Sequence, residues 1–217
     1  MILYSILFSL WPCLFILLQE TTQCSQKIIR NYLSFGHSIS ASILSYGSIL
    51  FGYPEIIQQL VVNLSISYFV WDTLYIMIKR DWSELPYIYH HVIITWMLLN
   101  VNLQINSDLF TYVLFLGEFS NIFNYIVYHM IKQQYDNWYL ILVKIIQVLW
   151  FSYFRMYRLT SVFYYDFHKL SGYLLPYNLV VIYVMGVIWG YKQLQSTIKN
   201  IEQYNSVTIT TPLKKIK

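Results

Sequence analysis

Charged residues are scarce in this sequence. Asp, Glu, Lys and Arg make up 11% of the 217 residues, whereas hydrophobic residues make up 57% and the mean hydropathy is +0.47. A soluble domain of this size needs more charge to cover its surface. The composition therefore argues against a sizeable soluble domain and predicts a protein that is embedded in a lipid bilayer.

Cysteine is also scarce, and several chemical motifs are missing. Cys13 and Cys24 form neither a disulfide framework nor a zinc-ligand spacing. The chain contains no phosphate-binding glycine loop, no dinucleotide fingerprint, no CxxC pair, no nucleophile elbow and no box of three histidines. We therefore expect no metal site, no bound cofactor and no nucleic-acid partner.

What the chain does contain is a series of apolar runs separated by short polar breaks. The runs are roughly 17 to 25 residues long, the length that a helix needs to cross a bilayer. We predict an all-α, polytopic membrane protein with about seven transmembrane helices. Their approximate ranges are 2–18, 33–51, 60–78, 86–100, 109–131, 138–164 and 173–191.

The first run has an alternative interpretation. A cleaved signal peptide has a similar apolar length, but no Lys or Arg precedes this run and no convincing cleavage motif follows it. We therefore favour a first membrane helix over a signal peptide.

The basic residues predict the orientation of the helices. When the loops are assigned alternately to two sides, one side receives Lys169 alone, whereas nearly all other basic loop residues fall on the opposite side. Basic loops face the cytosol. We therefore expect a lumenal amino terminus and a cytosolic carboxyl terminus. The residues on the cytosolic side are Lys27, Arg30, Lys79, Arg80, Lys132, Lys192, Lys199, Lys214, Lys215 and Lys217, with Lys144 near them.

The carboxyl-terminal tail carries a candidate retrieval signal. Lys214 and Lys215 are fourth and third from the end, as in the dilysine signal that a coat complex recognises on proteins of the endoplasmic reticulum membrane. A basic tail that only touches anionic lipid is the alternative. We expect a multi-pass protein of the endoplasmic reticulum membrane, and the sequence leaves open whether it is a homodimer.

Ionisable side chains lie within the predicted spans. If all of them faced lipid, their insertion would cost on the order of 20 kcal/mol. The spans must therefore enclose a polar interior in which these groups meet. They are His37, Asp72, His90, His91, Glu118, His129, Arg155 and Arg158.

The adjacent pair His90–His91 begins the fourth span. Neighbouring helical residues point about 100° apart, which does not suit a shared metal ion; zinc helices use an i, i+4 pair instead. One imidazole as nucleophile or general base, with the other orienting it or binding substrate, is the chemical interpretation. The alternative is that one histidine only marks the interfacial end of the helix.

Two further polar sets lie on the fifth and sixth spans. Arg155 and Arg158 are three residues apart, so a regular helix would place them on one face. We expect Glu118 to pair with Arg155, and Asp72 to pair with Arg158 or a histidine, although such pairs could simply hold helices together. The stripe on the fifth span consists of Glu118, Asn121, Tyr125 and His129, with Asn124 beside it.

Five segments resemble the TLC homology domain in their order along the chain. The most specific element is the His-His pair followed by an acidic residue, Glu118, about 27 residues later. The resemblance covers roughly residues 28–195. The matching segments are NYLSFGHSISAS (31–42), YFVWDTL (68–74), YHHVIIT (89–95), LGEFSNIFN (116–124) and Arg155.

The resemblance implies a domain organisation and an architecture. Residues 1–27 would form a peripheral first helix and loop, residues 28–195 the TLC domain and residues 196–217 a cytosolic basic tail. In the ceramide synthases of this family, six helices surround a lipid tunnel that contains the His pair. An acyl chain passes from acyl-CoA to a long-chain base amine, by resemblance through an acyl-histidine.

One departure separates this chain from the ceramide synthases. They carry a His-Asp followed by a second Asp in the later helix, whereas this chain has Gly117–Glu118–Phe119–Ser120, as in the TLC-domain-containing proteins linked to membrane lipid composition. We expect a role in lipid homeostasis, with acyl transfer from acyl-CoA to an amine-bearing lipid as the candidate reaction. The alternative is a non-enzymatic cargo receptor or lipid-sensing scaffold.

The candidate site residues follow from the resemblance and from the polar inventory. His90 and His91 would be the nucleophile or base, and Glu118 would orient them. The expected substrate-binding residues are Asp72, Arg155, His37, Asn121, Asn124 and Tyr125.

Overall fold

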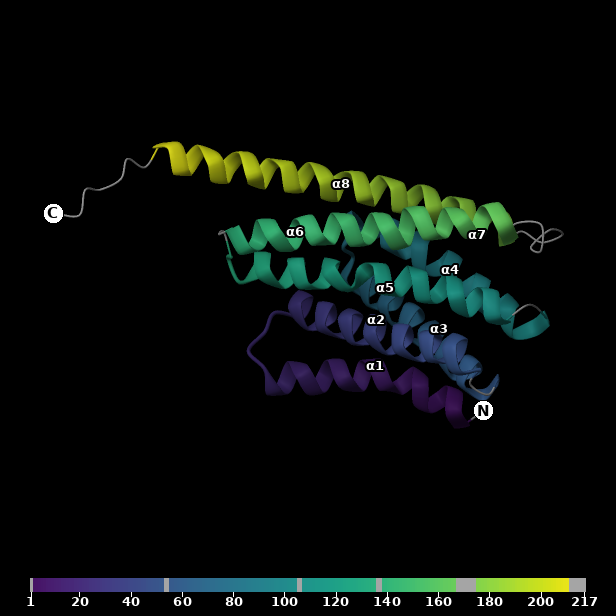
Figure 1. Ribbon diagram of the computed structural model, residues 1–217. Helices are drawn as coiled ribbons and strands as arrows, with labels where there is room; N and C mark the ends of the chain where they lie inside the picture. The colour runs from purple at the N-terminus through teal and green to yellow at the C-terminus, as the bar shows by residue number, and fades with distance from the viewer. Residues whose placement is uncertain (1, 53–54, 105–106, 136–137, 167–174, 211–217) are drawn as a thin grey trace.

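The computed structural model is all-helical over the residues it describes, and these contain no strand. Figure 1 shows elongated helices that lie side by side, with α1 along one edge of the bundle and α8 along the other. The described residues are 2–52, 55–104, 107–135, 138–166 and 175–210.

Each predicted apolar run coincides with a helix. The helices are α1 (Ile2–Thr21), α2 (Gln26–Phe51), α3 (Glu55–Lys79), α4 (Leu85–Gln104), α5 (Ser107–Lys132), α6 (Trp138–Phe151), α7 (Leu159–Asp166) and α8 (Leu175–Thr210), with a short 3₁₀ turn η1 (Trp82–Glu84) before α4. A π-helical segment, η2 (Ser152–Arg158), joins α6 and α7 into one continuous rod.

The last helix is longer than the apolar run predicted. We expected the seventh span to end near Tyr191, but α8 continues to Thr210. No Gly or Pro lies between Tyr191 and Thr210, so no residue that breaks helices interrupts the polar part of the segment. Figure 1 shows this end of α8 extending past the neighbouring helices. Lys214 and Lys215 lie outside the described residues.

Polar residues concentrate inside the bundle. The buried face of α2 contains His37 and a row of serines, whereas Ile43 and Phe51 on the same helix are 66% and 71% exposed. Ile78 on α3 and Leu149 on α6 are 77% and 65% exposed. Buried polar side chains thus lie beside a buried apolar core, and many large apolar side chains face outwards, a combination that is unusual in soluble proteins.

Two of the described helices are long and apolar enough to cross a membrane. They cover Glu55–Lys79 and Trp138–Tyr165, and Ile6–Thr21 is a shorter apolar helix. The other long helices carry the serines, amides and charged residues of the interior, which lower their mean hydropathy.

The helices pack around a layered core. The helix α1 contacts α2 and α3, and the indole of Trp11 donates a hydrogen bond to the Ser67 hydroxyl on α3 over 3.0 Å. An apolar cluster joins α4, α5 and α8 through Ile93, Phe110 and Leu179. Residues of α3, α4, α5, α6 and α8 also line cavities within the bundle.

Candidate functional site

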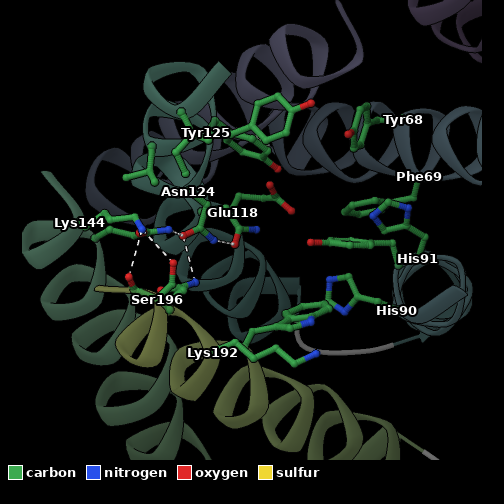
Figure 2. A pocket seen from close by; sticks show the side chains of 18 residues that line it. Tyr68, Phe69, His90, His91, Glu118, Asn124, Tyr125, Lys144, Lys192 and Ser196 are labelled. Carbon is green, nitrogen blue, oxygen red and sulfur yellow. Dashed lines mark hydrogen bonds between the residues drawn. The ribbon is translucent and has the colours of Figure 1, made fainter. Parts of the chain in front are cut away.

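The cavity beside the histidine pair, called the main cavity below, has a volume of about 390 Å³ and lies among α3, α4, α5, α6 and α8. A cavity lined by Tyr112 and Arg158 is larger, at about 540 Å³. Figure 2 shows side chains from the helices around the main cavity converging on it, with His90 and His91 on one side and Lys144 and Ser196 on the other. Its lining includes most of the predicted site residues. The polar and charged side chains are Tyr68, Tyr87, His90, His91, Glu118, Asn121, Asn124, Tyr125, Tyr128, Lys144, Gln147, Lys192, Gln193 and Ser196.

Both histidines of the pair line this cavity and are almost fully buried. His90 is 5% exposed and His91 is 7% exposed. Their rings are 5.7 Å apart, and the His90 ring meets the edge of Trp189 on α8 at 5.2 Å. The first turns of α4 therefore present two imidazoles to one enclosed space, as acid–base chemistry on a bound ligand requires.

A network of charged side chains lies next to His91. Its Nδ1 lies 3.2 Å from Oδ2 of Asp72 on α3, and Asp72 accepts two hydrogen bonds from the Arg30 guanidinium, at 2.5 and 2.8 Å. Arg30 also bonds to Glu84 in η1. The predicted pairing of Asp72 with a histidine is thus present, whereas its alternative partner, Arg158, bonds to the Tyr112 hydroxyl instead.

Arg30 is a functional candidate that the sequence reasoning missed, because it lies before the second apolar run and was assigned to a cytosolic loop. The helix α2 begins at Gln26, which brings Arg30 to the inner surface. Around it lies the side cavity, of about 200 Å³. The side cavity shares Tyr68, Tyr87, His91, Tyr125 and Tyr128 with the main cavity.

Glu118 faces α2 rather than the histidine pair. The Ser38 hydroxyl lies 2.6 Å from the Glu118 backbone oxygen and 2.9 Å from its Oε2, and His37 Nδ1 lies 3.6 Å from the same Oε2. The ring of His37 stacks on Tyr68 at 4.1 Å, and its Nε2 lies 3.1 Å from the Ser65 hydroxyl. His37 thus supports Glu118 from behind and does not line the main cavity.

A group of amides lines the cavity where α5, α6 and α8 meet. The side-chain oxygen of Asn124 accepts hydrogen bonds from Gln147 at 2.9 Å and from Gln193 at 3.1 Å, and its amide nitrogen donates to Asn121 at 3.2 Å. Tyr125 lines both the main and the side cavity. The predicted stripe on α5 therefore faces the cavity as far as Tyr125.

The last member of that stripe lies elsewhere. Nε2 of His129 is 2.9 Å from the Asn31 side-chain amide, and its ring stacks on Tyr32 at 4.2 Å. This histidine does not line the main cavity and therefore serves as a control position.

Lys144 is a second residue that the sequence reasoning missed. It is 3% exposed, and its ammonium donates to the Ser196 hydroxyl and to Asn200, both at 2.8 Å, and to the Ser196 backbone oxygen at 3.3 Å. Lys192 also lines the cavity. Among the described residues that line the main cavity, Glu118 is the only acidic one. This end of the cavity therefore carries excess positive charge.

Arg155 lies behind Glu118 at the inner cavity, a small apolar space of about 40 Å³. It is 3% exposed, and no ion pair joins it to Glu118 among the described residues. The predicted Glu118–Arg155 pair is therefore not formed. Arg158 lines a different cavity, with Tyr112. The π-helical turn separates the two arginines because its residues are spaced differently around the axis from those of an α-helix.

No known family model, curated protein or solved structure matches this chain. The described residues also contain no cluster of three His, Cys, Asp or Glu side chains that could hold a metal ion.

Proposed function

We propose that this chain is a TLC-type protein of the endoplasmic reticulum membrane that crosses the bilayer about seven times and acts in membrane lipid homeostasis. Its candidate reaction is acyl transfer from acyl-CoA to an amine-bearing lipid. The observation that carries the proposal is that His90, His91 and Glu118 line one cavity, and that Glu118 also lines the apolar inner cavity.

The distribution of side chains supports the membrane part of the proposal. Buried serines, histidines and charged groups combined with exposed Ile, Leu and Phe suit a bundle whose exterior contacts lipid. A soluble bundle with this much exposed apolar surface would aggregate.

The contact between Asp72 and His91 supports the chemical part. The Nδ1 of His91 lies 3.2 Å from the Asp72 carboxylate, which favours the proton on Nδ1, and an imidazole protonated there keeps a lone pair on Nε2 for use as a nucleophile or general base. As base, this nitrogen would take the proton of the acceptor amine while the amine attacks the thioester carbonyl. The thiolate would then leave and accept that proton.

The orientation of Glu118 supports a second candidate function, that of a non-enzymatic receptor or scaffold that binds lipid. Its Oε2 is held by Ser38 on α2. A lipid-binding receptor or scaffold needs the cavity but needs no carboxylate against the histidine pair.

Whole-cell lipidomics tests catalysis directly. We expect one class of acylated lipid to rise with wild-type protein and to stay at background with the His90→Ala/His91→Ala and Glu118→Gln variants, because each variant loses a group of the proposed site. His129→Ala is the matched control, since this imidazole lies outside the main cavity. Equal membrane insertion is verified first. A profile that wild type and the double variant change equally would move the assignment to the receptor.

Cysteine labelling tests the topology. In permeabilised cells with intact endoplasmic reticulum, we expect a membrane-impermeant maleimide to label Cys24 and Lys132→Cys, at the ends that carry the basic residues. Glu55→Cys, at the opposite end of the bundle, should react only after the reticulum membrane is opened. Each reporter requires that the other cysteines be removed, and Cys13 and Cys24 are the only two in the chain. Labelling of all three positions from one side would contradict the predicted topology.

A further inference from the structure

Arg155 presents a buried guanidinium edge that the packing of helices alone does not explain. Neither its Nε nor its Nη2 has a hydrogen-bond partner among the described residues, although both atoms are buried. A charged donor that is desolvated without a partner is costly, so each such group in a native protein requires an explanation, of which a bound ligand is one.

In a second arginine, Arg30, the same edge binds a carboxylate. Arg30 uses Nε and Nη2 to hold the two carboxylate oxygens of Asp72, at 2.5 and 2.8 Å. This side-on pairing is a strong, planar contact between guanidinium and carboxylate. Arg155 has the corresponding pair of donors without a hydrogen-bond partner among the described residues, and its side chain lines the inner cavity.

Two glycines make room for this side chain. A Cβ at Gly117 on α5 would lie 2.8 Å from Nη1 of Arg155, and a Cβ at Gly186 on α8 would lie 3.0 Å from its Cγ. The two helices therefore come close to the arginine only because these positions lack a side chain.

The inner cavity defines the ligand further. Apart from Arg155 and Glu118 its lining is apolar, and its volume of about 40 Å³ suits a group of a few atoms. Oε2 of Glu118 is held on the side of Ser38 and His37. The apolar lining residues are Ile94, Met97, Leu98, Phe110, Val113, Leu114, Leu159 and Ile182, with Gly117.

We infer that the guanidinium of Arg155 binds the carboxylate of a single acyl chain, which reaches it from the main cavity past Glu118, the residue that lines both cavities. This assignment rests on the proposed lipid cavity and adds a ligand class, a long-chain carboxylate. The carboxylate belongs either to a free fatty acid or to an acyl chain that is linked to an amino acid.

Equilibrium binding to the purified protein in phosphatidylcholine nanodiscs tests the inference without turnover. The probes are radiolabelled oleate, N-oleoylglycine and, as the neutral match, methyl oleate. We expect Arg155→Lys to weaken binding of the preferred acid at least about 10-fold, because an ammonium keeps the charge but loses the paired donors. Gly117→Ala should weaken it similarly by displacing the guanidinium. Gly36→Ala is the matched control, since a Cβ there meets nothing within 4 Å.

The outcomes separate this inference from the proposed function. Arg155-dependent binding of either acid supports the site, and the tighter of the two names the source. Equal binding of methyl oleate and oleate, or unchanged binding by folded Arg155→Lys and Gly117→Ala, overturns it. If binding depends on Arg155 while the lipidome is unchanged, the carboxylate site stands and acyl transfer fails; the reverse result leaves acyl transfer standing alone.

Discussion

Replacing Asp72 with Asn is expected to lower the free energy of unfolding by about 3 kcal/mol, towards the lower end of the range for breaking a buried ion pair. The Asp72 side chain is 1% exposed and that of Arg30 is 14% exposed, so solvent does little to compensate the cation that remains. Glu84 still compensates part of the positive charge of Arg30, because it also bonds to that guanidinium. The free energy can be measured by SDS titration of the protein in dodecylmaltoside micelles.

The same substitution should abolish the lipid product that depends on the His pair. Without the carboxylate, His91 loses the negative charge that lies 3.2 Å from its Nδ1 and favours the proton on that nitrogen, so Nε2 is less available as a base. Adding Arg30→Leu to Asp72→Asn should restore stability in a double-mutant cycle, because the uncompensated cation is gone, but it should not restore the product. Recovery of both properties would show that Asp72 acts only as a structural ion-pair partner.

An exposed ion pair nearby provides the control. Lys27 and Asp81 lie 2.7 Å apart, with side chains 61% and 27% exposed. The hydrogen bond from Lys27 lowers the pKa of Asp81, so the contribution of this pair is present at neutral pH and is lost as the pH falls through that lowered pKa. Asp81→Asn at pH 7 should change stability far less than Asp72→Asn, since exposed ion pairs contribute little. Equal losses would contradict the argument from burial.

The helices were predictable from the sequence because each is a long apolar run that ends in polar residues. The gathering of polar groups was predictable for a similar reason. His90, His91 and Glu118 are costly in lipid, and this cost alone predicts that they turn inwards. Asn121 and Tyr125 were predicted to share a stripe, with Asn124 beside it, because α5 is regular over that length.

The pairing of those groups was not predictable, since it depends on the rotation and depth of each helix. Arg30 was assigned to a loop because its neighbours are polar, and only the start of α2 at Gln26 shows that it reaches Asp72. The predicted relation between Arg155 and Arg158 assumed an α-helix, and the π-helical segment changed their directions. No residue in that segment, such as a proline, marks the change in the sequence.

The position of the Lys144 ammonium inside the bundle was also not predictable from its neighbours in the sequence. A lysine near the cytosolic end of an apolar run usually extends to the water interface. Here Ser196 and Asn200 on α8 hold the ammonium inside, and that part of α8 lies beyond the predicted seventh span. The extra turns of α8 are therefore part of the cavity wall.

Lys144→Met is expected to weaken binding of oleoyl-CoA about 10- to 100-fold, the effect of losing a hydrogen bond from a charged group. Its partners in the structure are neutral oxygens, so the positive charge remains to attract the phosphates of a ligand that enters at this end. The fold should tolerate the change, because methionine has a similar shape and removes a buried charge that has no carboxylate partner. Binding can be measured by equilibrium filtration on nanodiscs.

A thioester without phosphates separates charge from packing. The N-acetylcysteamine thioester of oleate should bind equally to wild type and Lys144→Met, since it carries the acyl chain but no anionic group. Lys199→Met on the exposed face of α8 is the matched control and should leave oleoyl-CoA binding unchanged. Because the charge is buried, the difference between wild type and Lys144→Met should persist at salt concentrations that screen surface lysines. Equal weakening for both thioesters would mean that Lys144 shapes the cavity without recognising phosphate.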